Sequence, residues 1–169
     1  DETLEHVVHF RSLRRLGLTG LGVTDVGVAR IATLRGLENL ELLGSGITDA
    51  RLAELTQLPA LRRLTLDKSV NLTDAGLSAL DGMGGLIHLS LDFNPQFTDE
   101  LAPHVARHTA LEKLYLTKTQ LTDDGLAQLQ GLTRLKKLSL EETQITDDGL
   151  TALHGMHSLR NLWLYGTHV

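Results

Sequence analysis

Three side chains that commonly bind zinc recur every four residues in this chain, at Glu100, His104 and His108. Residues four apart share one face of a helix, so their spacing suits a shared ion. A zinc site needs three or four converging ligands with supporting hydrogen bonds. His108, however, falls in an apolar column of the sequence, and Pro103 disturbs the helix. We therefore expect no metal site here, and we interpret the other histidine pairs, His6/His9 and His154/His157, as surface residues.

Two acidic tripeptides, Asp123-Asp124-Gly125 and Asp147-Asp148-Gly149, resemble fragments of calcium loops. They lack the alternating oxygen ligands and the closing glutamate of such loops. Each follows a threonine, which is a favoured helix N-cap, and early acidic side chains suit the positive end of a helix. The sequence contains no nucleophile elbow, phosphate-binding loop or dinucleotide fingerprint. We therefore expect no catalytic residue, no cofactor and no enzymatic activity.

Composition narrows the class of partner. The 169 residues carry 16 Lys and Arg against 21 Asp and Glu, a net charge of −5. This balance argues against nucleic acid, because phosphate binding needs a concentrated basic surface. There is no cysteine, and no apolar run approaches the ~20 residues of a membrane span. Residues 1–3 do not resemble a secretory signal, and the composition leaves the compartment and the oligomeric state open.

The elements that position these side chains follow a repeat. The pattern L-x-x-L-x-L begins seven times, at spacings of 24, 24, 25, 25, 24 and 24 residues. Such a period predicts a stack of equivalent units within one domain, 1–169. After a partial helix at 1–12, the first to seventh units are 13–36, 37–60, 61–85, 86–110, 111–134, 135–158 and the partial unit 159–169.

One unit illustrates the expected local structure. In the fifth unit, Leu111, Leu114 and Leu116 predict a short half-buried strand. A helix should follow Thr122, with Leu126, Leu129 and Leu132 on its apolar face. The same apolar triplet recurs along the chain: Leu4/Val7/Phe10, Val28/Ile31/Leu34, Leu52/Leu55/Leu58, Leu77/Leu80/Met83 and Leu150/Leu153/Met156. Pro103 and the smaller triplet Ala102/Val105/His108 predict a late or distorted helix in the fourth unit.

The whole chain resembles the leucine-rich repeat, and more narrowly its bacterial "TD-x-GL" variety, which is related to the cysteine-containing repeats of F-box adaptors. The resemblance rests on the leucine pattern and on six Thr-Asp pairs: 24–25, 48–49, 73–74, 98–99, 122–123 and 146–147. It implies an α/β fold, a right-handed curved solenoid with parallel strands on the concave face and short helices on the convex face. It also implies binding of a ligand, usually a protein, on the concave face.

The third and fourth units each contain one extra residue between the strand and the Thr-Asp pair. The loops concerned, 67–71 and 92–96, belong to neighbouring units, so we expect them to form one raised ridge. Loops often carry binding residues, although surface loops also tolerate insertions without functional consequence.

The outward strand positions form columns. One column is largely basic (Arg15, Asn39, Arg63, His88, Lys113, Lys137 and Asn161), and another contains Asp67, Asp92 and Glu141. Phe93, Tyr115, Trp163 and Tyr165 add aromatic side chains, which are typical interface anchors. For the basic column itself we favour a row of solvated side chains whose stems lie over leucines.

We therefore predict a non-enzymatic module that binds a protein on its concave face. The candidate binding residues are Arg63, Asp67, Lys68, His88, Asp92, Phe93, Lys113, Tyr115, Trp163 and Tyr165. One alternative is a structural or sensor segment of a larger protein. Another is a polyanion or glycan binder that uses Arg15, Arg63, His88, Lys113 and Lys137. Because neither end of the chain resembles a polar cap, we also expect a longer natural protein or end-to-end self-association.

Overall fold

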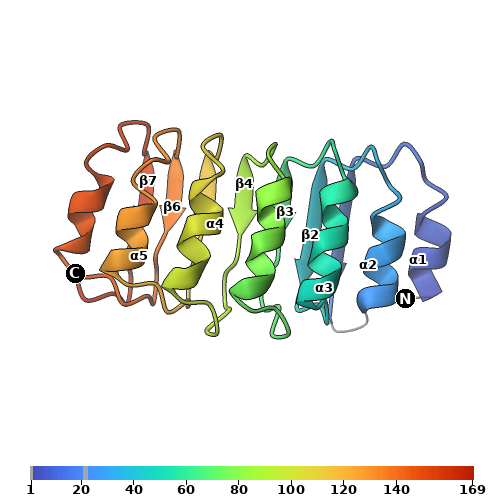
Figure 1. Ribbon diagram of the computed structural model, residues 1–169, viewed down its shortest axis with the longest axis horizontal. Helices are drawn as coiled ribbons and strands as arrows, with labels where there is room; N and C mark the ends of the chain where they lie inside the picture. The colour runs from blue at the N-terminus through green and yellow to red at the C-terminus, as the bar shows by residue number, and fades with distance from the viewer. Residues whose placement is uncertain (1, 21–22) are drawn as a thin grey trace.

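A computed structural model describes residues 2–20 and 23–169. Asp1 of the predicted partial helix 1–12 and residues 21–22 of the first predicted unit lie outside the described part. One strand per unit joins a single parallel sheet in chain order, in equivalent register throughout. The strands are β1 (Arg15–Thr19), β2 (Asn39–Leu43), β3 (Arg63–Thr65), β4 (His88–Ser90), β5 (Lys113–Tyr115), β6 (Lys137–Ser139) and β7 (Asn161–Trp163). The predicted solenoid of parallel strands and short helices is confirmed (Figure 1).

Short helices cover one face of this sheet and leave the other face, called here the sheet face, open (Figure 1). Their bounds are α1 (Glu2–Val7), α2 (Asp25–Ile31), α3 (Asp49–Leu52), η1 (Ala53–Gln57), η2 (Ala75–Gly82), η3 (Asp99–Leu101), α4 (Ala102–Ala106), α5 (Asp123–Gln128) and η4 (Gly149–Leu153), where η marks a 3₁₀ helix. No helix of the described part is long and apolar enough to cross a membrane.

The core lies between the sheet and the helices and is built from the repeated leucine positions. In the fifth unit, Leu114 and Leu116 from the strand meet Leu126 and Leu129 from the helix, and all four are fully buried. Phe10 does not follow this pattern. It remains 62% exposed because α1 ends at Val7 and Phe10 lies in the turn beyond it, so the predicted core position of Phe10 is wrong.

The Thr-Asp pairs connect successive units. Thr24, Thr98 and Thr122 cap their own helices, as the sequence predicts. The aspartates of the first five pairs instead reach the next unit: Asp123, for example, accepts hydrogen bonds from the amide and the hydroxyl of Thr146, at 2.9 and 2.6 Å. The equivalent contacts are Asp25 to Thr48, Asp49 to Thr73, Asp74 to Thr98 and Asp99 to Thr122. The pairs therefore join neighbouring helix starts, and the calcium-like tripeptides serve in this contact.

Beyond each strand the chain makes the same left-handed turn. The residue two positions after the third leucine has a positive φ in every unit: Gly20, Gly44, Lys68, Phe93, Lys118, Glu142 and Gly166. Its amide donates to a carbonyl of the following unit, as Phe93 N does to Thr117 O at 2.7 Å. The turn is therefore a property of the stack and does not depend on the presence of glycine.

The fourth unit has the altered helix that its sequence predicts. The turn after Thr98 is 3₁₀ (η3), and the α-helix begins only at Ala102, with Pro103 in its first turn, where proline is tolerated. His108 occupies the position of the third apolar residue and is only 3% exposed. Neither ring nitrogen of His108 makes a hydrogen bond of regular geometry in the described structure, although a weaker contact with the backbone of Leu80 favours its protonated form. A buried polar group thus replaces the usual leucine.

Candidate functional site

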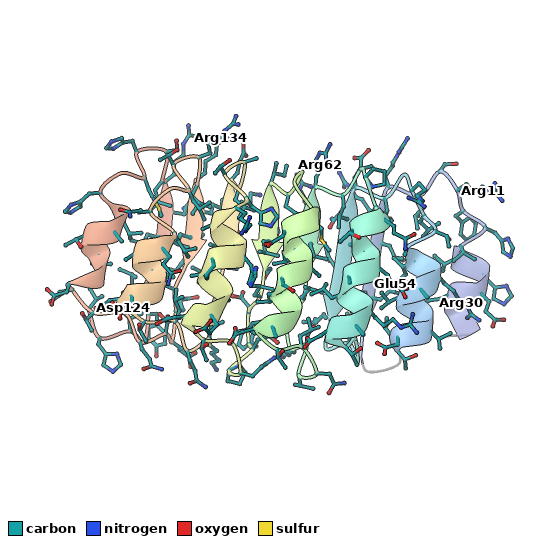
Figure 2. All side chains as sticks on the ribbon, viewed as in Figure 1. Arg11, Arg30, Glu54, Arg62, Asp124 and Arg134 are labelled. Carbon is teal, nitrogen blue, oxygen red and sulfur yellow. The ribbon has the colours of Figure 1, made fainter. Side chains whose placement is uncertain are left out.

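The sheet face presents the predicted columns in register. The basic column is unbroken from β3 to β6, because Arg63 pairs with His88, His88 with Lys113, and Lys113 with Lys137. Other positive side chains lie elsewhere. Arg62 and Arg134 lie at the upper edge in Figure 2, where the strands begin, and point outward from it. The residues that follow the strands lie at the opposite, lower edge, and they form the rest of the site.

Three rings form a continuous strip across β4 to β7. The rings of His88 and Tyr115 lie 5.4 Å apart at an angle of 39°, and those of Tyr115 and Trp163 lie 6.2 Å apart at 32°. Tyr115 and Trp163 belong to strands on either side of Ser139, which is only 2% exposed. Trp163 itself is 36% exposed. We call His88, Tyr115 and Trp163 the aromatic strip.

The surroundings of the aromatic strip keep its rings uncharged at neutral pH. Burial lowers the pKa of His88 to about 4, and the positive charges of Lys113 and Arg63 act in the same direction. Burial raises the pKa of the Tyr115 hydroxyl, and the nearby Asp92 carboxylate adds to the effect. The strip is therefore a neutral aromatic platform between charged columns.

Two carboxylates beside the strip are held by hydrogen bonds. Asp67 Oδ1 accepts from the hydroxyl of Ser90 at 2.6 Å and from the amide of Asp92 at 3.0 Å. Asp92 Oδ1 accepts from the amide of Thr117 at 2.6 Å. Burial raises the pKa of Asp67, and it raises that of Asp92 to about 6. No Lys or Arg of the described residues forms an ion pair with either carboxylate.

The side chains at the left-handed turns of units three to six contact one another. The ammonium groups of Lys68 and Lys118 lie 5.2 and 5.3 Å from the ring centroid of Phe93. Lys118 also forms an ion pair with Glu142 at 3.2 Å. Phe93 is 39% exposed, and the other three are exposed as well. We call Lys68, Phe93, Lys118 and Glu142 the left-handed row.

The loops that carry the extra residue are adjacent, as expected, and they extend to the lower edge in Figure 1. They are not uniformly raised, because Ser69 and Asn94 are fully buried. The amide group of Asn94 donates to the carbonyls of Leu66 and Leu91, both at 2.9 Å, and its oxygen accepts from the amide of Ser69 at 2.7 Å. This role of Asn94 was not predicted, although its place three residues after Leu91 is a regular position of the repeat.

Other residues lie apart from the strip. Tyr165 follows β7, is 79% exposed and lines an open groove of about 820 Å³ at the lower edge. The groove is also lined by Pro95, Lys118, Thr119, Gln120, Glu142, Thr143, Gln144, Gly166 and His168. On the helix side, His104 contacts Asp81 at 3.1 Å. Within 2–20 and 23–169, no three His, Asp or Glu side chains are placed to hold a metal ion.

Comparisons with known proteins agree with this geometry. Residues 109–169 match the sequence family described as leucine rich repeat. Among curated protein sequences, none matches the chain significantly. An internalin (inlF) from Listeria monocytogenes superimposes with a TM-score of 0.74 over 92% of this chain and 49% of its own, at 22% identity. Internalin C2 (inlC2) from the same organism gives 0.56 over 89% and 80%, also at 22% identity. The chain thus spans about half the length of the first internalin, and both likenesses concern the fold.

Proposed function

We propose that this leucine-rich-repeat protein is a non-enzymatic interaction module that binds a protein partner on its sheet face. The observation that carries the proposal is the aromatic strip, in which Tyr115 contacts both His88 and Trp163 between β4 and β7. Interfaces are enriched in aromatic side chains, which bury a large area with little loss of conformational freedom. The residues around the strip supply the polar rim that such an interface needs: Arg63, Asp67, Asp92 and Lys113.

The extent of the sheet suits a protein ligand. Parallel strands lie about 4.8 Å apart, so seven strands span on the order of 30 Å, which matches a standard protein–protein interface. The mixed charges of the rim favour a partner with charges of both signs.

Substitution of the strip tests the proposal. Partners are captured with the wild-type protein, identified, purified and measured by calorimetry against Tyr115→Ala and Trp163→Ala. Each variant should bind at least roughly tenfold more weakly, as expected for central aromatic anchors. Phe10→Ala is the matched control, because Phe10 is an exposed aromatic outside the sheet. Unchanged affinity in both strip variants would show that the partner does not use the sheet face.

Binding of a polyanion or glycan through the basic column is the less favoured function. Asn39 separates Arg15 from Arg63, Asn161 ends the column, and His88 is neutral because its pKa is lowered to about 4. Polyanion binding would weaken steeply with added salt and would depend on Arg63 and Lys113 more than on Tyr115. If the chain is instead a structural or sensor segment, none of these substitutions should change the affinity for a partner. End-to-end self-association through the chain ends stays a prediction.

We infer further that the chain belongs to the "TD-x-GL" variety of the repeat. The support is the series of aspartate-to-threonine contacts between units, of which Asp49 to Thr73 and Asp123 to Thr146 are examples. These contacts give the threonine and the aspartate of the motif a physical role in stacking, independent of any ligand.

A further inference from the structure

We propose that the left-handed row binds an acidic, extended segment of the partner protein. This inference names the chemistry of one partner segment and rests on the proposed protein-binding function. The row lies at the lower edge of the sheet, directly beyond the column that contains Asp67 and Asp92. It therefore forms a second contact surface beside the aromatic strip.

The first argument is the choice of residues at a strained backbone position. Every unit has a positive φ at this turn, and Gly44 and Gly166 show that the stack accepts glycine there. An L-residue with a side chain is disfavoured in that conformation, whereas glycine adopts it readily. Four successive units nevertheless carry large side chains at this position: Lys68, Phe93, Lys118 and Glu142. Their folding role is small because they are exposed, so a contact outside the chain accounts for them better.

The second argument is the arrangement of charge. Lys68 and Lys118 hold their ammonium groups 5.2 and 5.3 Å from the ring centroid of Phe93. In the described structure Lys68 forms no ion pair, and Lys118 has only the exposed pair with Glu142 at 3.2 Å. The carboxylates of Asp67 and Asp92 accept hydrogen bonds from Ser90 and Thr117, and Asp67 also interacts with Lys68 electrostatically, but neither carboxylate forms an ion pair with Lys68 or Lys118. The row thus offers two positive charges on either side of an apolar ring.

The third argument is the match to an extended peptide. Side chains at alternate positions of an extended chain lie on one face about 7 Å apart. Both ammonium groups adjoin one aromatic ring, so two carboxylates at alternate positions can each meet a lysine while their methylene groups cover Phe93. The open groove of about 820 Å³ continues from Lys118 and Glu142 past Gln120 and Gln144. Those amide side chains suit hydrogen bonds to a peptide main chain.

A synthetic nine-residue peptide with glutamate at three alternate positions is the probe, and the same peptide with glutamine is its control. Binding is followed by fluorescence anisotropy at low salt. The wild-type protein should bind the glutamate peptide at least roughly tenfold more tightly than the glutamine peptide, since charge-assisted contacts fall away in the latter. Equal affinity for the two peptides, or no binding of either, would overturn the proposal.

Variants with glycine in the row separate binding from folding. Lys68→Gly, Phe93→Gly and Lys118→Gly each place the residue that the turn prefers, so they should fold normally and weaken peptide binding by roughly threefold to tenfold. Glu142→Gln removes the competitor for Lys118 and should strengthen binding about twofold to fivefold. Arg134→Ala removes a positive charge at the upper edge and should leave binding unchanged. Peptide binding that is insensitive to all row variants contradicts the proposal.

A final comparison identifies the class of ligand and separates this proposal from the sheet-face function. Inorganic polyphosphate is titrated against the same variants. If it binds as tightly as the glutamate peptide and loses affinity in the same variants, the row is a general polyanion site and the acidic-peptide proposal fails. If the row variants lose peptide binding while Tyr115→Ala and Trp163→Ala bind the partner protein as the wild type does, the proposal for the row stands and the sheet-face function is refuted. If the row variants keep peptide binding while Tyr115→Ala and Trp163→Ala bind the partner protein more weakly, only the acidic-peptide proposal is refuted.

Discussion

The carboxylate of Asp123 occupies the space that a side chain at Gly149 would need: a Cβ built on Gly149 would lie 2.0 Å from Asp123 Oδ1. Asp123 reaches this position from the preceding unit and accepts both the amide and the hydroxyl of Thr146. These hydrogen bonds, with a further contact to the Gly149 amide, lower the pKa of Asp123. The glycine of the repeat motif is therefore required by an aspartate 26 positions earlier in the sequence.

The units that lack this glycine support the same relationship. Arg51 and Leu101 stand at the equivalent position, and there Asp25 and Asp74 lie 3.1 Å from the amide of the next threonine. In the units with glycine the corresponding distance is 2.8–2.9 Å, and each carboxylate oxygen takes one donor. A Cβ displaces the carboxylate, and the contact becomes longer and less regular.

Gly149→Ala should destabilise the protein by about 1–3 kcal/mol, because the added Cβ displaces the Asp123 carboxylate from Thr146. Gly131→Ala is the control, since a Cβ at Gly131 meets no atom within 4 Å. Chemical denaturation measures both. In the background of Asp123→Ala, the alanine at position 149 should cost much less. Fully additive effects would show that the two residues do not act together.

Phe93→Gly should leave the free energy of unfolding within about 1 kcal/mol of the wild type. Release of the left-handed strain offsets the lost contacts with Lys68 and Lys118 and the greater freedom of glycine in the unfolded chain. Phe97→Ala, four residues later, should cost about 3–5 kcal/mol, because Phe97 is fully buried. Thermal denaturation distinguishes the two. A large loss of stability in Phe93→Gly would mean that the row serves folding.

Asn94→Ala should destabilise the protein by about 2–4 kcal/mol. The change leaves the buried carbonyls of Leu66 and Leu91 and the amide of Ser69 without their partner. Asn71→Ala, in the neighbouring loop, removes one exposed hydrogen bond to Gly46 and should cost under about 0.5 kcal/mol. Urea denaturation compares the variants. Equal costs at both positions would contradict the role assigned to Asn94 as the internal anchor of the two loops.

His108→Leu should stabilise the protein by about 1–2 kcal/mol at neutral pH, because leucine replaces a buried imidazole whose ring nitrogens make no hydrogen bond of regular geometry. Burial lowers the pKa of His108 in the folded protein, while the nearby Asp81 acts in the opposite direction. Above the unfolded pKa of about 6.5 both states are neutral. As the pH falls below about 6.5 the unfolded state takes up the proton first, so stability decreases.

The difference in unfolding free energy between His108→Leu and the wild type should therefore widen as the pH falls from about 6.5. Subtracting the two curves removes the contribution of His88, whose pKa is also lowered. His104 and Arg107 contact Asp81 and are present in both the variant and the wild type, so the difference between the curves does not arise from them. A difference that is constant from pH 7 to pH 5 would refute a neutral buried imidazole at this position.

The sequence by itself determined the scaffold. The leucine period predicts one strand per unit, and the structure confirms a parallel sheet in chain order. The apolar triplets predict which helix face is buried, and Pro103 predicts the late α-helix of the fourth unit. These features follow from patterns within one unit, and each unit meets the same neighbours, so local periodicity is sufficient to specify them.

Only the tertiary structure decided which exposed side chains act together. The contact between Tyr115 and Trp163 spans 48 residues of sequence, and the row from Lys68 to Glu142 spans four units. The buried state of Asn94 likewise depends on a loop 25 residues earlier. These groupings depend on the register between strands and on the left-handed turn at each strand end. Both arise only when units stack, because neighbouring units then bring residues about 24 positions apart within a few ångströms.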